Sequence, residues 1–293
     1  MRRRTTRQLH PALGGLLGVL VLIGLWEGYK AVGPNDGWEL GGIRLLPRTS
    51  DLAMPHVWTM VTRLGEPTVG SAGPALWESV LRAGVKSLGI AGAGWLIGTV
   101  VGLVLAILMQ RFTTVRATIL PWVVLSQTVP LIAIAPLVRR WGAQLHLGPI
   151  DWKDWMSVSF IAAYLAFFPV AVGALRGLSS PDAAHADLMH VTGASWWQQL
   201  RSLRFPASVP YLLPALRLAA AGAVIGTVVA EVSIGLRGGI GRMIIEYAQA
   251  ASADPAKPWA PIGGAVLIGL IAAGVVGLLG MALRNYQRGE TSA

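Results

Sequence analysis

Six long runs of apolar residues, separated by polar segments, dominate the pattern along the chain. They cover approximately residues 12–32, 83–109, 118–138, 155–175, 209–230 and 261–283. Each is close to the roughly 20 residues that a helix needs to cross a bilayer core of about 30 Å. Because a spanning helix satisfies its own backbone hydrogen bonds, the pattern predicts an all-α integral membrane protein with about six transmembrane helices.

An arginine-rich segment precedes the first span, with arginines at positions 2, 3, 4 and 7. Signal peptides also begin in this way, so a cleaved signal and a retained helix both fit. Glu27, Tyr29 and Lys30 follow the apolar core without a small-x-small cleavage site, which favours a retained helix. Positive charge before a first helix marks the cytoplasmic side, so six spans place both termini in the cytoplasm.

Prolines and small residues modify the predicted helices. The third span contains Pro121, Pro130 and Pro136, which predict kinks. In other spans a small residue recurs at every fourth position, which lets helices approach closely. These predicted packing ridges are Gly94–Gly98–Gly102–Ala106, Gly222–Gly226–Ala230 and Ala265–Gly269–Ala273–Gly277.

The segment 33–82 is too long and too patterned for a simple outer loop. Its apolar positions follow a helical stripe that predicts an amphipathic helix along the membrane surface, with Leu52, Val57, Met60, Val61 and Leu64 on one face. The expected organisation is then an N-terminal helix with this outer segment (1–82), a membrane core (83–285) that contains a loop at 176–208, and a short tail (286–293).

Composition narrows the class of protein. The 293 residues are 54% hydrophobic and 13% charged, about half of the charged share typical of soluble domains. The net charge is +10, but the basic residues are scattered between apolar spans, which argues against nucleic-acid binding. No cysteine is present, so disulfides, thiolate catalysis and cysteine-type metal sites are excluded.

No enzyme signature is visible. The sequence lacks the G-x-x-x-x-G-K-[ST] loop, so it does not bind ATP through such a loop. His185 and His190 are five residues apart, on different faces of a helix, and no acidic or cysteine ligand completes a metal site. A membrane enzyme or a non-transporting scaffold is therefore disfavoured.

Polar residues inside the spans are few, and they are the candidates for a translocation path: Ser126, Gln127, Thr128, Thr227 and Glu231. Hydrogen bonding between helices explains such residues equally well. No Asp, Glu, Lys or His occupies the middle of a span. Because a proton relay needs such groups, the alternative of a stand-alone ion-coupled carrier or channel loses support.

A polar, strongly patterned loop interrupts the apolar second half at residues 179–206. Pro181 and Asp182 predict a helix start, with Ser180 or Asp182 as the cap, and Gly193 predicts its end. Ser195 can cap a second helix, from Trp196 to about Leu203, before Phe205 and Pro206 redirect the chain. A helix–glycine–helix unit between two spans is suited to binding a soluble partner.

The loop resembles the cytoplasmic motif E-A-A-x3-G-x9-I-x-L-P of binding-protein-dependent ABC importer permeases. Gly193 and Pro206 match it, Asp187 stands at the Glu position, Leu188 and Met189 replace the two alanines, and Leu203 and Phe205 replace Ile and Leu. The segment 125–137 and Ala230-Glu231 with Gly238-Gly239-Ile240-Gly241 are similar to the nitrate, sulfonate and taurine branch, which includes riboflavin and pyrimidine permeases.

This resemblance implies a MetI-like permease fold in a bacterial plasma (inner) membrane. The loop, including Asp182, Ala194 and Ser195, would be the coupling helix of an ATP-driven importer for a small polar solute. Two cytoplasmic ABC ATPase subunits would bind ATP and Mg²⁺, so no cofactor is expected in this chain. A second permease copy, identical or homologous, and a periplasmic or lipid-anchored solute-binding protein complete the implied assembly.

Overall fold

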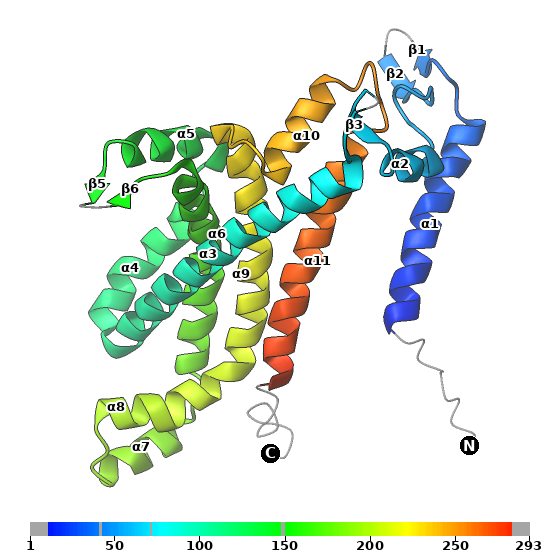
Figure 1. The fold of residues 1–293 in the computed structure, drawn as a ribbon. Helices are drawn as coiled ribbons and strands as arrows, with labels where there is room; N and C mark the ends of the chain where they lie inside the picture. Colours follow the sequence, from blue (N-terminus) through cyan, green and yellow to red (C-terminus); the bar gives the residue numbers. More distant parts are fainter. Residues whose placement is uncertain (1–10, 41–42, 71, 148–149, 283–293) are drawn as a thin grey trace, which may run out of the picture. The chain divides into compact units, whose positions relative to one another are not determined.

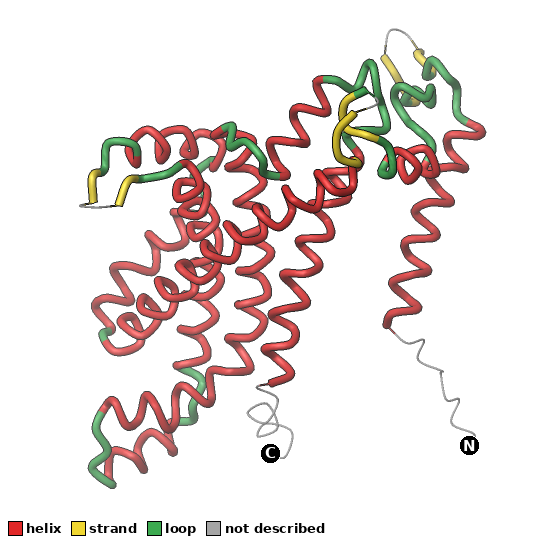
Figure 2. Tube along the Cα trace, in the orientation of Figure 1, coloured by secondary structure: helices red, strands yellow, loops and turns green. Residues whose placement is uncertain are grey.

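The structure is a computed structural model that describes residues 11–40, 43–70, 72–147 and 150–282. The described residues are mainly helical, with three short antiparallel hairpins (Figure 2). They group into two compact units: residues 11–78 with 246–260, and residues 79–245 with 261–282. The predicted tail at 286–293 lies outside the described residues.

Five helices of the described chain are long and apolar enough to cross a membrane. They are α1 (Pro11–Val32), α3 (Leu76–Arg111), α6 (Asp154–Leu178), α9 (Phe205–Ile234) and α11 (Trp259–Ala282) (Figure 1). A sixth span results if α4 (Thr113–Ser126) and α5 (Leu131–Gly142) count as one broken span. The predicted class, an all-α membrane protein with about six apolar helices, is confirmed.

The prediction that the third span is one kinked helix is wrong. α4 and α5 are separate helices that meet at an angle of 104°. Pro130 is the residue that precedes α5, and it lacks the amide that would continue α4. It also disfavours a helical conformation at Val129. Pro121 and Pro136 lie inside α4 and α5, so of the three prolines Pro130 marks the break.

The core of the second unit is the pair α6 and α9, with α3 packed against α6. A Cβ atom built at Gly98 would lie 2.7 Å from the Ala163 carbonyl oxygen and 2.7 Å from the Ala166 Cβ. Gly94 and Gly102 are equally close to α6, and Gly226 lies close to Ala162. The predicted ridges on α3 and α9 therefore pack closely, as expected from their small residues.

The predicted ridge on α11 behaves differently. Cβ atoms built at Gly269 and Gly277 would meet no atom of the described chain within 4 Å. The repeat of small residues is the same as on α3, but within this chain no helix packs against these glycines. The prediction that this ridge packs closely is therefore not met inside the described chain.

The first unit combines α1 and residues 246–260 with several short elements. These are β1 (Trp38–Leu40), β2 (Ile43–Leu46), α2 (Val57–Arg63), β3 (Pro67–Val69) and β4 (Ala72–Ala75). Helix α2 contains Val57, Met60 and Val61 of the predicted stripe, and Leu64 is its C-cap residue. Leu52 lies outside it, in a turn, so the predicted amphipathic helix is shorter than expected.

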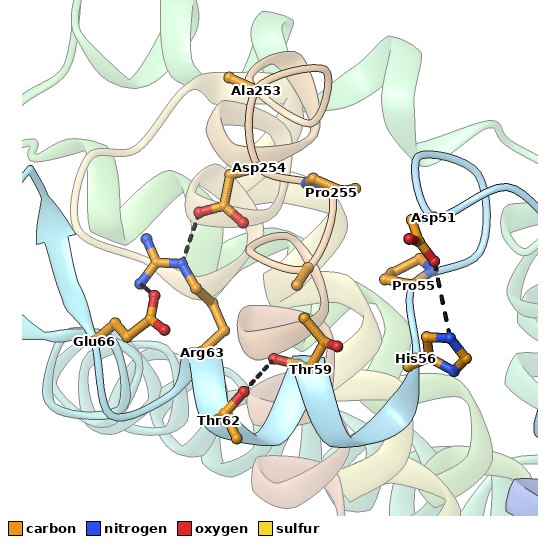
Figure 3. Close-up of a pocket in the computed structure, with 11 residues that line it drawn as sticks. Asp51, Pro55, His56, Thr59, Thr62, Arg63, Glu66, Ala253, Asp254 and Pro255 are labelled. Atoms are coloured by element: carbon orange, nitrogen blue, oxygen red, sulfur yellow. Dashed lines mark hydrogen bonds and ion pairs between the residues drawn. The ribbon is translucent and has the colours of Figure 1, made fainter.

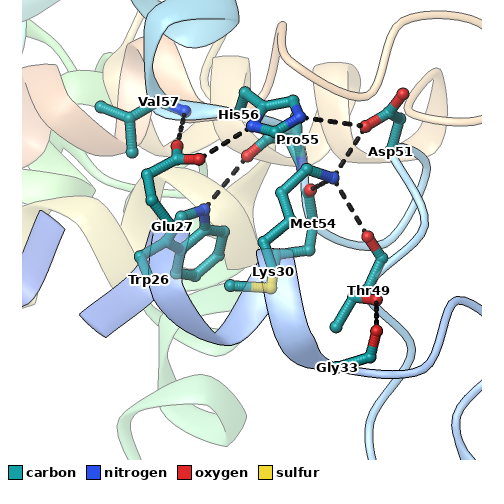
Figure 4. A network of polar contacts seen from close by, with 10 residues as sticks. All are labelled: Trp26, Glu27, Lys30, Gly33, Thr49, Asp51, Met54, Pro55, His56 and Val57. Carbon is teal, nitrogen blue, oxygen red and sulfur yellow. Dashed lines mark hydrogen bonds and ion pairs between the residues drawn. The ribbon is translucent and has the colours of Figure 1, made fainter. Parts of the chain in front are cut away.

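Polar side chains at the end of α1 hold the segment 47–57 (Figure 4). Glu27 accepts the Val57 amide through Oε1 at 2.7 Å and contacts His56 Nδ1 through Oε2 at 2.8 Å. Lys30 Nζ donates to the Thr49 carbonyl (3.0 Å), the Met54 carbonyl (2.6 Å) and the Asp51 carboxylate (2.7 Å). The hydrogen bond from Lys30 lowers the pKa of Asp51 below its ordinary value.

Two further elements complete the second unit. The hairpin β5 (His146–Leu147) and β6 (Ile150–Asp151) connects α5 to α6. Helix α10 (Ile240–Gln249) follows α9 after a short turn. Arg139 on α5 donates to both carboxylate oxygens of Asp154, each at 2.9 Å, and to the Ile234 carbonyl at 3.1 Å. This arginine therefore ties α5 to the start of α6 and the end of α9.

Candidate functional site

The 179–206 loop begins with an exposed helix at one end of α6 (Figure 1). Helix α7 covers Ala183–Val191, close to its predicted bounds. Asp182 is the N-cap residue, but its side chain makes no capping hydrogen bond. No residue of α7 is buried. Helix α7 therefore adds little to the core of this chain, and its surface is free for another molecule.

Gly193 forms the turn that ends α7. Its φ is +74°, in the left-handed region that glycine adopts without strain. The Gly193 amide donates to the His190 carbonyl at 3.0 Å, and the Ala194 amide donates to the Met189 carbonyl at 2.9 Å. A Cβ atom at Gly193 would meet nothing within 4 Å. The position therefore needs glycine for its backbone conformation and not for lack of space.

Ser195 starts the second helix with a reciprocal cap. The Ser195 amide donates to Gln198 Oε1 at 2.7 Å, and the Gln198 amide donates to Ser195 Oγ at 3.4 Å. This capping box satisfies two amides that the first helical turn leaves free. Helix α8 (Trp196–Gln199) therefore has a defined start, as the sequence pattern predicts.

The second helix does not stop before Pro206, which corrects the prediction of a break there. A π-helical turn, η1 (Leu200–Arg204), follows α8 and leads directly into α9 at Phe205. In a π turn the hydrogen bonds span five residues, and the Phe205 amide donates to the Leu200 carbonyl. Because this wider turn comes first, Pro206 sits at the start of α9, where its missing amide costs little.

The base of the loop is fixed by buried and polar contacts. Gln199 is buried and donates to the Ala194 carbonyl at 3.3 Å. Arg204 Nη1 donates to the Leu178 carbonyl at the end of α6 at 3.1 Å. The Arg111 guanidinium lies 4.6 Å from the Trp196 ring centroid, within the range of a cation–π interaction. The base of the loop, residues 196–204, is thus fixed by these contacts, whereas its tip, helix α7, is exposed.

The exposed tip has an apolar face. Leu188 is 61% exposed and Val191 is 86% exposed, and with Ala184 they follow the i, i+4, i+7 spacing of one helix face. Trp197 on α8 is 66% exposed. Large apolar side chains gathered on an otherwise polar loop are typical of a protein–protein contact. Asp187 is also exposed, whereas Met189 and Ala194 are half-buried.

The remaining loop candidates lie at the base. Leu203 is in the π turn, and Phe205 and Pro206 begin α9. The structure thus brings the predicted residues from Asp182 to Ser195 together in α7 and the glycine turn, and places Leu203, Phe205 and Pro206 where the loop joins α9.

Three polar candidates of the predicted path lie at the break between α4 and α5. Ser126 Oγ donates to the Val123 carbonyl at 2.7 Å, and Thr128 Oγ1 donates to the Leu125 carbonyl at 2.8 Å. Gln127 Nε2 donates to Ser126 Oγ at 3.2 Å, and the Tyr164 hydroxyl donates to the Ser126 carbonyl. Ser126 and Gln127 are half-buried and Thr128 is exposed. Their side chains are therefore not fully enclosed by the described part of this chain.

The other two candidates are enclosed in this chain. Thr227 and Glu231 on α9 are both completely buried. Glu231 accepts hydrogen bonds from the Ser87 hydroxyl (2.6 Å) and the Gly241 amide (2.8 Å). Ser87 was not a candidate from the sequence, because its partners lie 144 and 153 residues away along the chain.

A cavity of about 260 Å³ lies in the first unit, between α2 and residues 253–256 (Figure 3). Arg63 pairs with Asp254 at 2.7 Å and with Glu66 at 3.4 Å. Asp51 is bound by Lys30. The acidic and basic groups that line the cavity are therefore already paired with one another or with Lys30.

Across the described residues, no group of three or more His, Cys, Asp or Glu side chains could hold a metal ion. These features define a class: a helical membrane protein with a broken span and an exposed helix–glycine–helix loop.

Comparison with known proteins identifies the family within this class. Residues 98–289 match the binding-protein-dependent transport system inner membrane component family, and the chain belongs to it. The matched region contains the broken span, the 179–206 loop and helices α9 to α11. The resemblance inferred from the loop motif is therefore confirmed at the level of the family.

Several curated relatives are transport permeases. The chain is 31% identical to the formylaminopyrimidine transport permease protein ThiX of Halalkalibacterium halodurans, over 61% of this chain and 66% of that protein. It is 27% identical to the putative aliphatic sulfonates transport permease protein SsuC of Bacillus subtilis, over 85% and 79%. It is 31% identical to the riboflavin transport system permease protein RibX of Chloroflexus aurantiacus, over 42% of each. The chain thus spans just under two thirds of the first relative and less than half of the third.

Proposed function

We propose that this chain is the membrane-spanning permease subunit of an ATP-driven importer, and that the 179–206 loop is where the ATPase acts on it. The observation that carries the proposal is the exposed apolar face of α7, held on a rigid base. An exposed Leu188 and Val191 are costly in water and gain stability when a partner covers them. Membership of a permease family gives the partner its class, a cytoplasmic ABC ATPase.

In this proposal the ATPase drives transport because its contacts with the 179–206 loop differ between the conformational states of the permease. A ligand shifts a conformational equilibrium only as far as it binds one state better than the other. ATP and Mg²⁺, bound by the partner, would change the position of α7. Because α8, η1 and α9 form one continuous helical run, Trp196–Ile234, a displacement of the loop tilts α9 directly.

The proposed assembly places the chain in a bacterial plasma (inner) membrane, with the loop and both termini in the cytoplasm. The arginines that precede α1 support this orientation. A second permease copy, identical or homologous, completes the pathway, and a periplasmic or lipid-anchored binding protein delivers the solute. Exposed apolar side chains on α3 and α11 are available for lipid or for the second copy.

The proposed solute is small and polar: a sulfonate, nitrate, or a riboflavin- or pyrimidine-like heterocycle. The relatives named for aliphatic sulfonates, formylaminopyrimidine and riboflavin support this range. Ser126, Gln127 and Thr128 at the α4–α5 break are the proposed lining of the path. Thr227 and Glu231 are enclosed in this chain, so they would reach a solute only after α9 moves.

The test replaces α7 alone. A Gly/Ser linker in place of residues 183–191 leaves Gln199, Leu200 and Arg204 at the base of the loop intact. We expect the variant to reach the membrane but to lose the co-purifying ATPase. An unchanged yield of ATPase would contradict the proposed docking site.

Point substitutions at Gly193 refine the test. Gly193→Pro cannot adopt the observed φ of +74°, so it should abolish ATP-driven uptake. Gly193→Asn is the matched control, because asparagine tolerates the left-handed region. Uptake that survived the proline substitution would show that the turn does not couple the ATPase to transport.

A further inference from the structure

A buried carboxylate and a buried serine join three helices of the second unit. Ser87 on α3 donates from Oγ to Glu231 Oε1 on α9 at 2.6 Å. Ser87 Oγ accepts the Ile240 amide at 2.9 Å, and Glu231 Oε2 accepts the Gly241 amide at 2.8 Å. Both side chains are completely buried. Two other helices therefore cap the first turn of α10, and we name this set of contacts the Glu231–Ser87 clamp.

The sequence around the first turn of α10 is shaped to receive the carboxylate. A Cβ atom at Gly239 would lie 2.3 Å from Glu231 Oε1. A Cβ atom at Gly241 would lie 2.3 Å from the Val228 carbonyl oxygen. Neither approach is compatible with a side chain, so the two glycines let α10 close onto α9. The glycine-rich segment after α9 thus has a definite structural partner in Glu231.

The covalent connection between α9 and α10 is a turn bounded by two glycines. Helix α9 ends at Ile234, its C-cap residue Gly235 has φ of +75°, and Gly238 has φ of +78°. Lys86 on α3 donates to the Arg237 carbonyl at 2.6 Å and attaches this turn to α3. The clamp is a second connection, because it runs from α9 to the Gly241 amide directly.

A carboxylate is also an expensive means of simple packing. Burying it costs free energy that its hydrogen bonds only offset, and apolar side chains of similar volume often hold helices together as well. Unlike an apolar side chain, the carboxylate fixes the position of α9 relative to α3 and α10, because each of its two oxygens binds one specific group. Glu231 lies in the last turn of α9, at the opposite end of this helix from the 179–206 loop. Helix α9 has 30 residues, about 45 Å at 1.5 Å per residue.

We propose that Glu231 and Ser87 are positioning residues of the transport cycle, which pass a displacement of α9 on to α10. The inference rests on the proposed function, in which the ATPase moves α9 through the 179–206 loop. Helix α10 leads into residues 246–260, which belong to the other compact unit. Movement of its first turn is therefore one route by which an event at the loop reaches that part of the chain.

The test compares two clamp variants with a matched control. Ser87→Ala removes both hydrogen bonds of the hydroxyl, and Glu231→Gln places an NH₂ group where one carboxylate oxygen accepts a hydrogen bond. Ser233→Ala is the control, because Ser233 lies near the same end of α9 and its hydroxyl bonds only to the Val229 carbonyl of its own helix, at 2.9 Å. Each variant is purified with its ATPase and reconstituted with the binding protein.

The readout is solute imported per ATP hydrolysed, which a purely structural role would not change in correctly assembled complexes. We expect Ser87→Ala to keep basal ATP hydrolysis, and both clamp variants to lose between about twofold and thirtyfold in this ratio. Ser233→Ala should match the unchanged chain. A ratio equal to that of the control in both clamp variants would overturn the proposal.

A second measurement follows the first turn of α10. The chain has no cysteine, so Ile240→Cys is a unique label site, and Ile240 is completely buried. We expect a soluble maleimide to label it faster when Ser87→Ala or Glu231→Gln is also present. Equal labelling rates would overturn the proposal, as would failure of both clamp variants to assemble with the ATPase. Absence of ATP-driven uptake by the unchanged chain would instead overturn the proposed function, and the clamp's role with it.

Discussion

The meaning of an exposed apolar residue depends on where it lies. On α3 or α11 an exposed leucine fits contact with lipid, as in any membrane-spanning helix. Leu188 and Val191 instead lie on a loop that is too polar to be embedded in the bilayer. Their exposure needs another explanation, and a docked protein partner supplies it.

Leu188→Asp and Val191→Asp should each weaken binding of the ATPase without unfolding the permease. Truncation of a central contact residue typically costs about 2 kcal/mol or more, roughly thirtyfold in affinity. His190→Ala is the control, because His190 lies outside the face formed by Ala184, Leu188 and Val191. The measurement is the dissociation constant of the detergent-purified permease for its ATPase. Equal affinities for Leu188→Asp and His190→Ala would place the contact elsewhere.

Lys30 and Asp51 illustrate how unequal the two partners of one ion pair can be. Lys30 is nearly buried and binds two backbone carbonyls besides the carboxylate, whereas Asp51 is exposed. Lys30→Met should therefore lower the local stability of segment 47–57 by about 1–3 kcal/mol, because two carbonyls lose their donor. Asp51→Asn should change it little, since exposed ion pairs contribute little. Hydrogen exchange of the Met54 region distinguishes the two.

The pH dependence of this pair follows from the lowered pKa of Asp51. A lowered pKa means that the ionised form is favoured in the folded chain. The contribution of the ionised Asp51 to the free energy of unfolding is complete above the pKa of an unperturbed aspartate, about 3.9. It is lost as the pH falls through the lower pKa of the folded state. Near neutral pH the contribution of the Lys30–Asp51 ion pair to stability should therefore not depend on pH.

At the scale of elements, identical sequence patterns have different structural outcomes. Small residues recur every four positions on α3 and on α11, but the glycines of α3 meet α6 while Gly269 and Gly277 meet no described atom. A repeat of small residues shows that another helix could pack closely there. Which helix does so depends on the tertiary fold. The positions of the apolar spans could be predicted because burial in a bilayer follows directly from a run of apolar residues.

Gly98→Ala and Gly92→Ala on α3 test this difference. A methyl group at Gly98 would collide with Ala163 and Ala166 on α6, so we expect a loss of about 1–3 kcal/mol. Gly92 has nothing within 4 Å, so alanine there should be neutral or stabilise by up to about 1 kcal/mol. Thermal unfolding in detergent measures both. A melting temperature for Gly98→Ala at or above that of Gly92→Ala would contradict the α3–α6 packing.

Other features could not be predicted from the sequence. The loop could be predicted, because Gly193 and Ser195 act through neighbours within a few positions. The continuation of α8 through a π turn into α9 was missed, since Pro206 alone predicts a break. The hydrogen bond between Ser87 and Glu231 could not be predicted, because it joins residues 144 positions apart. Local sequence patterns predict local structure. Polar contacts between residues far apart in the sequence can be found only once the fold is known.

At the scale of the whole molecule, α9 connects the features that matter for function. Its continuous helical run begins in the docking loop, packs along α6, and ends at the Glu231–Ser87 clamp. In the proposed function a partner ATPase drives the conformational change of this chain. The proposed contact for that ATPase is the exposed face of α7 in the 179–206 loop.

The most direct test of this account is solute uptake into proteoliposomes that contain the permease, its ATPase and the binding protein. We expect uptake to require ATP, and to be abolished when residues 183–191 are replaced by a Gly/Ser linker although the permease remains folded. Uptake that proceeds without the ATPase, driven by an ion gradient, would contradict the account and identify a stand-alone carrier.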